Sequence, residues 1–109
     1  MNDSEELWDK RYSDNPVLNP PSEFLEEFEQ YLPTQGTCVD IAGGNGRNAL
    51  WFAKKGYTTS VIDISSVALN QATKSAQSQK VELECIYWDI EKNLLPPERT
   101  WDIALLTLF

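Results

Sequence analysis

Three glycines and one carboxylate lie within seven residues of this sequence, in Asp40-Ile41-Ala42-Gly43-Gly44-Asn45-Gly46. Glycine lets the backbone adopt positive φ and lets a ligand approach where a Cβ would block it. The apolar residues before the glycines predict a buried strand, and a helix is predicted from about Asn48. The run Gly44-x-Gly46-x-x-Ala49 also satisfies the dinucleotide fingerprint, so nucleotide cofactors and nucleosides both fit this strand, turn and helix. A tight turn that binds no ligand is the other interpretation.

The charge of Asp40 helps to choose between these ligands. A carboxylate at the mouth of the strand is poorly placed beside a pyrophosphate, but it suits a ligand that carries an ammonium and a sulfonium. S-adenosylmethionine is such a ligand. The run D-I-A-G-G-N-G resembles the D-x-G-x-G-x-G first motif of Rossmann-like (class I) S-adenosylmethionine-dependent methyltransferases, with Ala42 in place of the first glycine. The longer run V-D-I-A-G-G-N-G-R-N-A-L-W-F-A-K-K-G-Y resembles the tellurite-resistance and thiopurine methyltransferase-like branch, in which G-R-N leads into the first helix.

A second acid, Asp63, ends the β-branched run 58–62, which predicts a second buried parallel strand. It lies 17 residues after Gly46, near the spacing of roughly 20 residues at which an acid holds ribose hydroxyls. The resemblance implies that Asp63 accepts both ribose hydroxyls and that Ile64 packs on the adenine face. The same residues also suit a helix start, with Ser65 or Ser66 as the cap.

A third acid, Asp89, ends a third predicted strand, 81–88. Asp89-Ile90 resembles the third methyltransferase motif, which implies that the carboxylate accepts the adenine amino group and that Ile90 covers the ring. An exposed loop acid is the alternative.

The N-terminal residues carry a further resemblance. Trp8-Asp9-Lys10-Arg11-Tyr12 resembles the W-D-x-R-Y opening of the same branch, where the N-terminal segment folds over the cofactor. Arg11 would then face the methionine carboxylate, because a planar guanidinium suits that group. A helix that only packs on the edge of the domain is the alternative.

These motifs give one set of candidate cofactor-binding residues. The set is Arg11, Asp40, Ala42, Gly43, Gly44, Gly46, Asn48, Asp63, Ile64, Asp89 and Ile90. No residue is assigned a catalytic role, because methyl transfer by in-line displacement needs mainly alignment and exclusion of water and can proceed without a strong base.

The elements that position these residues alternate between strands and helices. Ser22 is expected to cap a helix that Pro33 and Gly36 end, residues 67–79 predict a helix, and residues 101–109 predict a fourth strand buried on both sides. Right-handed crossovers predict a parallel sheet of order 3-2-1-4 in a Rossmann-like three-layer α/β/α fold. We expect residues 1–21 to form a cofactor-capping helix and proline-rich connection, and residues 22–109 a partial methyltransferase domain.

The family continues through a further helix and three more strands, so the resemblance implies a fold that is incomplete relative to the seven-stranded one and truncated after its fourth strand. The fourth strand would then present an apolar edge, and one face of the sheet would lack its covering helix. We therefore expect self-association or a partner chain at the fourth strand.

Composition limits the remaining possibilities. The chain has 109 residues, a net charge of -8 and a pI near 4.4, which argues against a nucleic-acid partner. No run is long and apolar enough for a membrane span and the start is acidic, so a cytoplasmic protein is expected. No metal is expected without histidine, and Cys38 and Cys85 should stay free because a strand separates them.

The leading hypothesis is methyl transfer from S-adenosylmethionine to a small-molecule acceptor. A non-catalytic remnant that binds the cofactor or another chain is the alternative, and a nicotinamide-dependent oxidoreductase, which would have no evident use for Asp40, is the third.

Overall fold

The computed structural model describes residues 3–92 and 99–107. Helix α1 (Asp3–Asp14) precedes α2 (Phe24–Phe28), a short 3-10 helix (Glu29–Tyr31), β1 (Thr37–Ile41), α3 (Arg47–Lys54), β2 (Thr58–Asp63), α4 (Ser66–Gln79), β3 (Glu84–Tyr87) and β4 (Ile103–Leu106). The last two residues of the predicted fourth strand lie outside the described residues.

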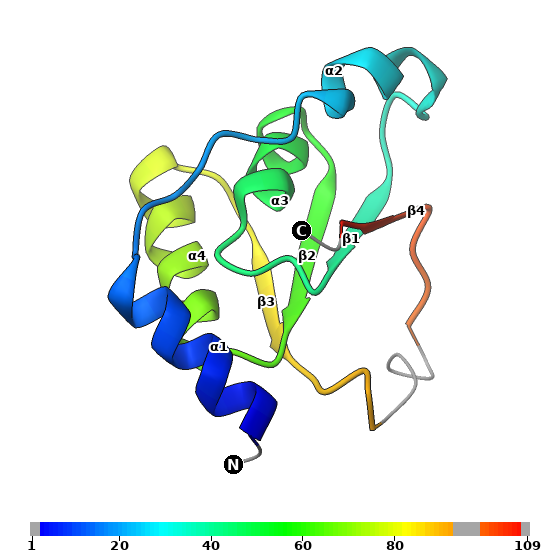
Figure 1. The fold of residues 1–109 in the computed structure, drawn as a ribbon. Coiled ribbons are helices and arrows are strands. Elements are labelled where there is room, and N and C mark those ends of the chain that lie inside the picture. The colour runs from blue at the N-terminus through cyan, green and yellow to red at the C-terminus, as the bar shows by residue number, and fades with distance from the viewer. Residues whose placement is uncertain (1–2, 93–98, 108–109) are drawn as a thin grey trace.

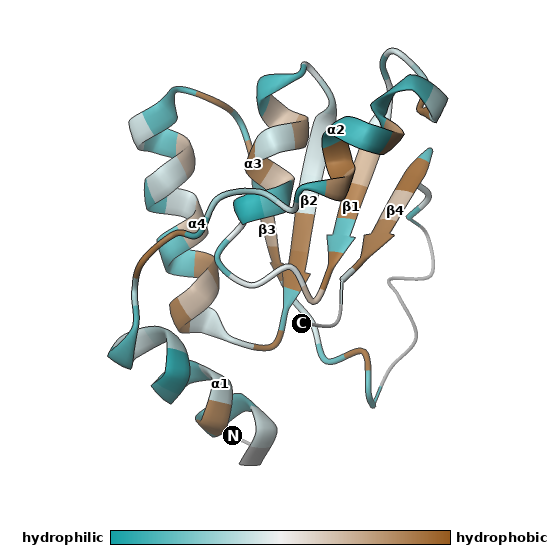
Figure 2. Ribbon diagram, turned by 45° about the horizontal axis from the view of Figure 1, so that its top comes forward, coloured by the Kyte–Doolittle hydropathy of each residue, from teal (hydrophilic) through white to brown (hydrophobic). Residues whose placement is uncertain are grey.

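The four strands form one parallel sheet of order β3-β2-β1-β4, which confirms the predicted order (Figure 1). Helices α3 and α4 pack on the same face, where Ala49, Val61, Leu69 and Ala72 form one core cluster. A second cluster joins Leu25, Cys38, Phe52 and Tyr57. The strands are largely hydrophobic and α1 is largely hydrophilic (Figure 2). Cys38 and Cys85 are both free, with β2 between their strands, as expected.

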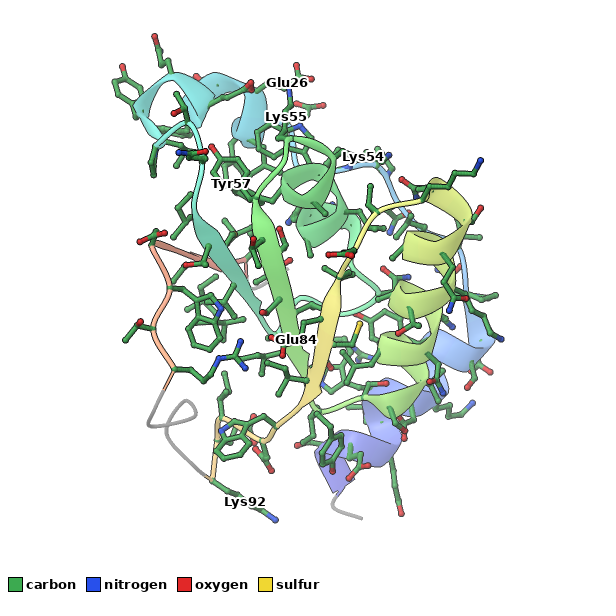
Figure 3. The ribbon with its side chains drawn as sticks, turned by 180° about the vertical axis from the view of Figure 1, so that it is seen from behind. Glu26, Lys54, Lys55, Tyr57, Glu84 and Lys92 are labelled. Atoms are coloured by element: carbon green, nitrogen blue, oxygen red, sulfur yellow. The ribbon has the colours of Figure 1, made fainter. Side chains whose placement is uncertain are left out.

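The opposite face of the sheet carries no helix within the described residues (Figure 3). The Trp101 indole N–H there donates to Ser60 Oγ at 3.4 Å, and Ser60 Oγ donates to Glu84 Oε1 at 2.7 Å. Arg99 pairs with Glu84 at 2.6 Å and stacks over Trp101 at 5.0 Å. These contacts hold residues 99–101 against the sheet.

Three local predictions need correction. Glu23, not Ser22, is the N-cap of α2, and the Ser22 hydroxyl has no hydrogen-bond partner among the described residues. The Ser22 backbone N–H instead donates to Asn48 Oδ1 at 2.8 Å, which ties the proline-rich connection to α3. β3 is shorter than predicted, since residues 81–83 do not join the sheet. β4 is not buried on both sides, because no described helix covers the face that exposes Leu106 at 55%.

Two features are absent from the described residues. No helix there is both long and apolar enough to cross a membrane. No group of three or more histidine, cysteine or acidic residues is placed to hold a metal ion.

Candidate cofactor-binding site

The loop between β1 and α3 is built on left-handed backbone conformations. Ala42, Gly44 and Gly46 have φ of 56°, 62° and 91°. The loop is fixed by the Gly43 N–H, which donates to the Ile62 carbonyl at 3.2 Å, and by the Gly46 N–H, which donates to the Gly43 carbonyl at 3.2 Å. Ala42 therefore adopts the conformation for which glycine is normally selected. This explains why the D-x-G-x-G-x-G motif that the sequence resembles has glycine at the position of Ala42.

Two of the glycines are required by close approaches. A Cβ on Gly43 would lie 2.6 Å from Asp40 Cγ, so glycine allows the loop to close over that carboxylate. A Cβ on Gly44 would collide with the Tyr12 hydroxyl, so glycine allows α1 to contact the loop. The glycine loop thus lies against Asp40 in β1 and against Tyr12 in the N-terminal helix α1.

Asp40 is 1% exposed, and neither of its carboxylate oxygens has a hydrogen-bond partner of normal geometry among the described residues. Burial is the main cause that raises its pKa to about 7, and the charge of Asp63 adds to this effect. The charge of Arg47 and the nearby Ala49 N–H act in the opposite direction. A buried carboxylate without a partner is unfavourable, and a ligand cation would relieve that cost.

Asp63 is held at the end of β2 by two backbone amides. Its Oδ2 accepts from the Gly44 N–H and its Oδ1 accepts from the Ser65 N–H, both at 2.8 Å. Burial raises the pKa of Asp63, and these N–H groups partly oppose the rise. Each carboxylate oxygen has a second lone pair that can accept from a ligand. Ser65 caps α4 by accepting from the Ala68 N–H at 3.1 Å, which confirms the helix start that the sequence allowed. The ribose role of Asp63 stays a prediction.

Two adjoining cavities lie at this end of the sheet. The first cavity has a volume of about 330 Å³, and Asp63, Ile64, Asp89 and Ile90 are among its lining residues. The second has about 360 Å³ and is lined on its polar side by Arg11, Arg47, Asn48 and three further asparagines. Both cavities share Trp8, Tyr12, Ala42 and Thr107.

The structure brings most of the predicted residues to these cavities. Eight of the eleven line one cavity or both, namely Arg11, Ala42, Gly43, Asn48, Asp63, Ile64, Asp89 and Ile90. Asp40 lies beneath Gly43, and Gly44 and Gly46 are buried within the loop without lining a cavity. Asn48 also has the structural task of accepting the Ser22 N–H.

Helix α1 is a wall of both cavities and is more than an edge element. It lies beside the start of α4 (Figure 1), where Ser65 Oγ donates to Asp9 Oδ1 at 2.6 Å. The Gln71 side chain donates to the Tyr12 carbonyl at 2.9 Å, and the Tyr87 hydroxyl donates to Glu5 at 2.8 Å. These polar contacts place α1 across the ends of β2 and β3.

Several lining residues were not assigned from the sequence. Trp8 and Tyr12 are the shared aromatic wall, with ring centroids 6.2 Å apart, and their spacing of four residues on a helix was the available signal. Arg47 was noted only within the G-R-N run. The other unassigned lining residues include Asn15, Asn19, Asn45, Trp88 and Thr107, and nothing in their local sequence marks them as site residues.

Comparison with solved structures supports this fold. A structure from a study of the conversion of a disulfide bond into a thioacetal group during echinomycin biosynthesis matches with a TM-score of 0.83 and 22% identity, over 95% of this chain and 47% of that one. An S-adenosylmethionine-dependent methyltransferase from Thiobacillus denitrificans, in complex with S-adenosyl-L-homocysteine, matches with a TM-score of 0.66 and 21% identity, over 92% of this chain and 42% of that one. TehB from Haemophilus influenzae matches with a TM-score of 0.68 and 16% identity, over 95% of this chain and 34% of that one.

The chain thus spans less than half the length of these three proteins. No curated protein sequence matches it significantly. A family model described as a methyltransferase domain matches residues 38–109, which include the glycine loop and all four strands apart from the first residue of β1. Because this family model matches residues 38–109 and the sheet has the order β3-β2-β1-β4, the chain belongs to the methyltransferase domain family.

Proposed function

We propose that this chain binds S-adenosylmethionine and forms the cofactor-binding part of an enzyme that transfers a methyl group to a small-molecule acceptor. The observation that carries the proposal is the position of Asp40, Asp63 and Asp89 at the ends of three neighbouring parallel strands, around one glycine loop. Asp63 and Asp89 line the first cavity. Asp40 is buried beneath Gly43, which lines the second cavity, and has no hydrogen-bond partner of normal geometry among the described residues.

The residues fit the chemistry of this cofactor. Asp63 lies where ribose hydroxyls are held in this fold class, and Ile64 and Ile90 offer apolar surface to a base. Asp40 would balance an ammonium. Bound S-adenosylmethionine supplies an electrophilic methyl group on a sulfonium. Trp8 and Tyr12 cover the boundary of the two cavities, and we assign them the task of excluding water there.

The finer classification is also a proposal. The W-D-x-R-Y run at residues 8–12 and the G-R-N run at residues 46–48 favour the tellurite-resistance and thiopurine methyltransferase-like branch. A thiol, a metalloid, an amine and a small carboxylate are all acceptors compatible with the described residues.

Calorimetric titration with S-adenosylmethionine and S-adenosylhomocysteine tests the proposal. We expect micromolar affinity that is lost in Asp63→Ala and retained in Glu82→Ala, a matched control because Glu82 is exposed and lines neither of the two cavities. Binding of a nicotinamide dinucleotide in place of these ligands would refute the proposal, as would a folded chain that binds none of them.

The free edge of β4 carries the second part of the proposal. β4 pairs only with β1 among the described strands, and its Leu106 is 55% exposed. We propose that this edge associates with another strand, either from a second copy or from a partner chain. Sedimentation of the purified chain should then show self-association, or a monomer that shifts on adding a partner; a stable monomer with no partner would contradict this.

A further inference from the structure

Three aromatic rings form a cluster on α2 and the 3-10 helix that follows it. Phe24 and Phe28 are four residues apart and Tyr31 follows three residues later, so the three share one side of the segment. The ring centroids of Phe24 and Phe28 are 6.3 Å apart, and those of Phe28 and Tyr31 are 6.2 Å apart. Phe24 is half-buried against the core, whereas Phe28 is 52% and Tyr31 74% exposed. We call these three residues the aromatic patch.

Other residues of the segment attach it to the domain. Leu25 is buried in the core, and Lys55 at the end of α3 pairs with Glu29 at 3.2 Å (Figure 3). Phe28 and Tyr31 are therefore presented to solvent from an anchored segment. Exposed apolar side chains that touch one another differ from the single ones scattered over any surface, and aromatic rings are enriched at the centres of protein interfaces.

Acidic residues alternate with the aromatic ones along this segment. Glu23, Glu26 and Glu27 are exposed, and none of them forms an ion pair within the described part of the chain. An apolar centre with a charged rim is the common anatomy of a protein interface. Because this rim is negative, the complementary surface carries lysine or arginine. Their cations can also lie on the faces of the exposed rings.

The same charge decides against other occupants of the aromatic patch. The whole chain has a net charge of -8, so a second copy docked on this patch by two-fold symmetry would bring two acidic rims together. Nucleic acids and anionic membranes would be repelled in the same way. We propose that the aromatic patch docks a basic segment of a partner protein, in which lysine or arginine flanks an apolar side chain. None of the three patch residues lines either cavity of the cofactor-binding site, so this surface is separate from that site.

A labelled peptide of alternating arginine and leucine is the probe, and a peptide of alternating glutamate and leucine is its charge-reversed control. Binding is measured by fluorescence anisotropy at physiological ionic strength. We expect only the arginine peptide to bind. The double variant Phe28→Ser/Tyr31→Ser should lower its affinity by roughly 10- to 30-fold, as for the loss of the centre of an interface. Glu26→Gln/Glu27→Gln should lower it by roughly 3- to 10-fold, as for exposed ion pairs.

Glu6→Gln/Glu82→Gln is the matched control, because both residues are exposed, lie on other segments and carry the same total charge as the glutamates replaced in α2. It should leave the affinity unchanged. An equal loss in the two glutamine variants would show unspecific attraction to an acidic chain and overturn the inference. The absence of binding to wild type would also overturn it, as would an unchanged affinity in Phe28→Ser/Tyr31→Ser. Sedimentation without peptide tests the other occupant, since a dimer that this serine variant dissociates would assign the aromatic patch to a second copy instead.

Discussion

Replacing Asp40 by asparagine should change how stability depends on pH. The asparagine amide has the shape of the protonated carboxyl group but cannot ionise. In the folded chain the pKa of Asp40 is raised to about 7 from an ordinary value of 3.8, mainly by burial. The stability that Asp40 contributes is therefore fully present below about pH 4 and is lost as the pH rises through about 7.

The size of the effect follows from the two pKa values. At about 1.4 kcal/mol per pKa unit, the full difference is on the order of 4 kcal/mol, of which about 2 to 3 kcal/mol falls between about pH 5 and pH 8. The wild-type chain should lose that much free energy of unfolding relative to Asp40→Asn over this range. Asp63 titrates in both proteins, so its contribution largely cancels in the comparison.

Urea unfolding of both proteins at several pH values measures this difference. Parallel stability curves for wild type and Asp40→Asn would refute the reasoning, because they would mean that Asp40 has an ordinary pKa and finds a partner in solution. A second arm adds S-adenosylmethionine. Its ammonium should lower the pKa of Asp40, so the difference between the two curves should shrink when the ligand is saturating.

Three further predictions concern the loop and α1. Ala42→Gly should raise the free energy of unfolding by about 0.5 to 1 kcal/mol, because it removes a left-handed alanine at an exposed position with φ of 56°; an unchanged denaturant midpoint would contradict this. Gly44→Ala should cost at least about 1 kcal/mol, and a double-mutant cycle with Tyr12→Ala should show a smaller cost, since the new Cβ meets the Tyr12 hydroxyl; full additivity would argue against that contact. Asp9→Ala should speed amide hydrogen exchange in α1, because Asp9 accepts from Ser65 Oγ at 2.6 Å at the start of α4; unchanged protection would show that other contacts hold the helix.

The order of the strands was predictable because it follows from local patterns and from the handedness of crossovers. Strands β1 and β2 are marked by short apolar and β-branched runs. The connection through α3 makes them parallel neighbours, and the connection through α4 places β3 on the other side of β2. The ends of β3 and β4 were less predictable. Their extent depends on pairing with a neighbouring strand and on which segment covers each face, and neither is encoded in the residues of the strand itself.

The sequence alone determined which groups stand at the ends of the strands. Asp40 lies near the end of β1, Asp63 ends β2 and Asp89 follows β3. Because parallel strands end at the same edge of a sheet, spacing was sufficient to predict a common site. Only the tertiary structure decided the walls of that site. Trp8 and Tyr12 reach the boundary of the two cavities through contacts of α1 with residues more than fifty positions away, such as Asp9 with Ser65. The lining of the second cavity, which includes Arg47 and no described acidic residue, likewise arises from packing of the connection at residues 15–20 over α3, because long-range packing determines which residues become neighbours.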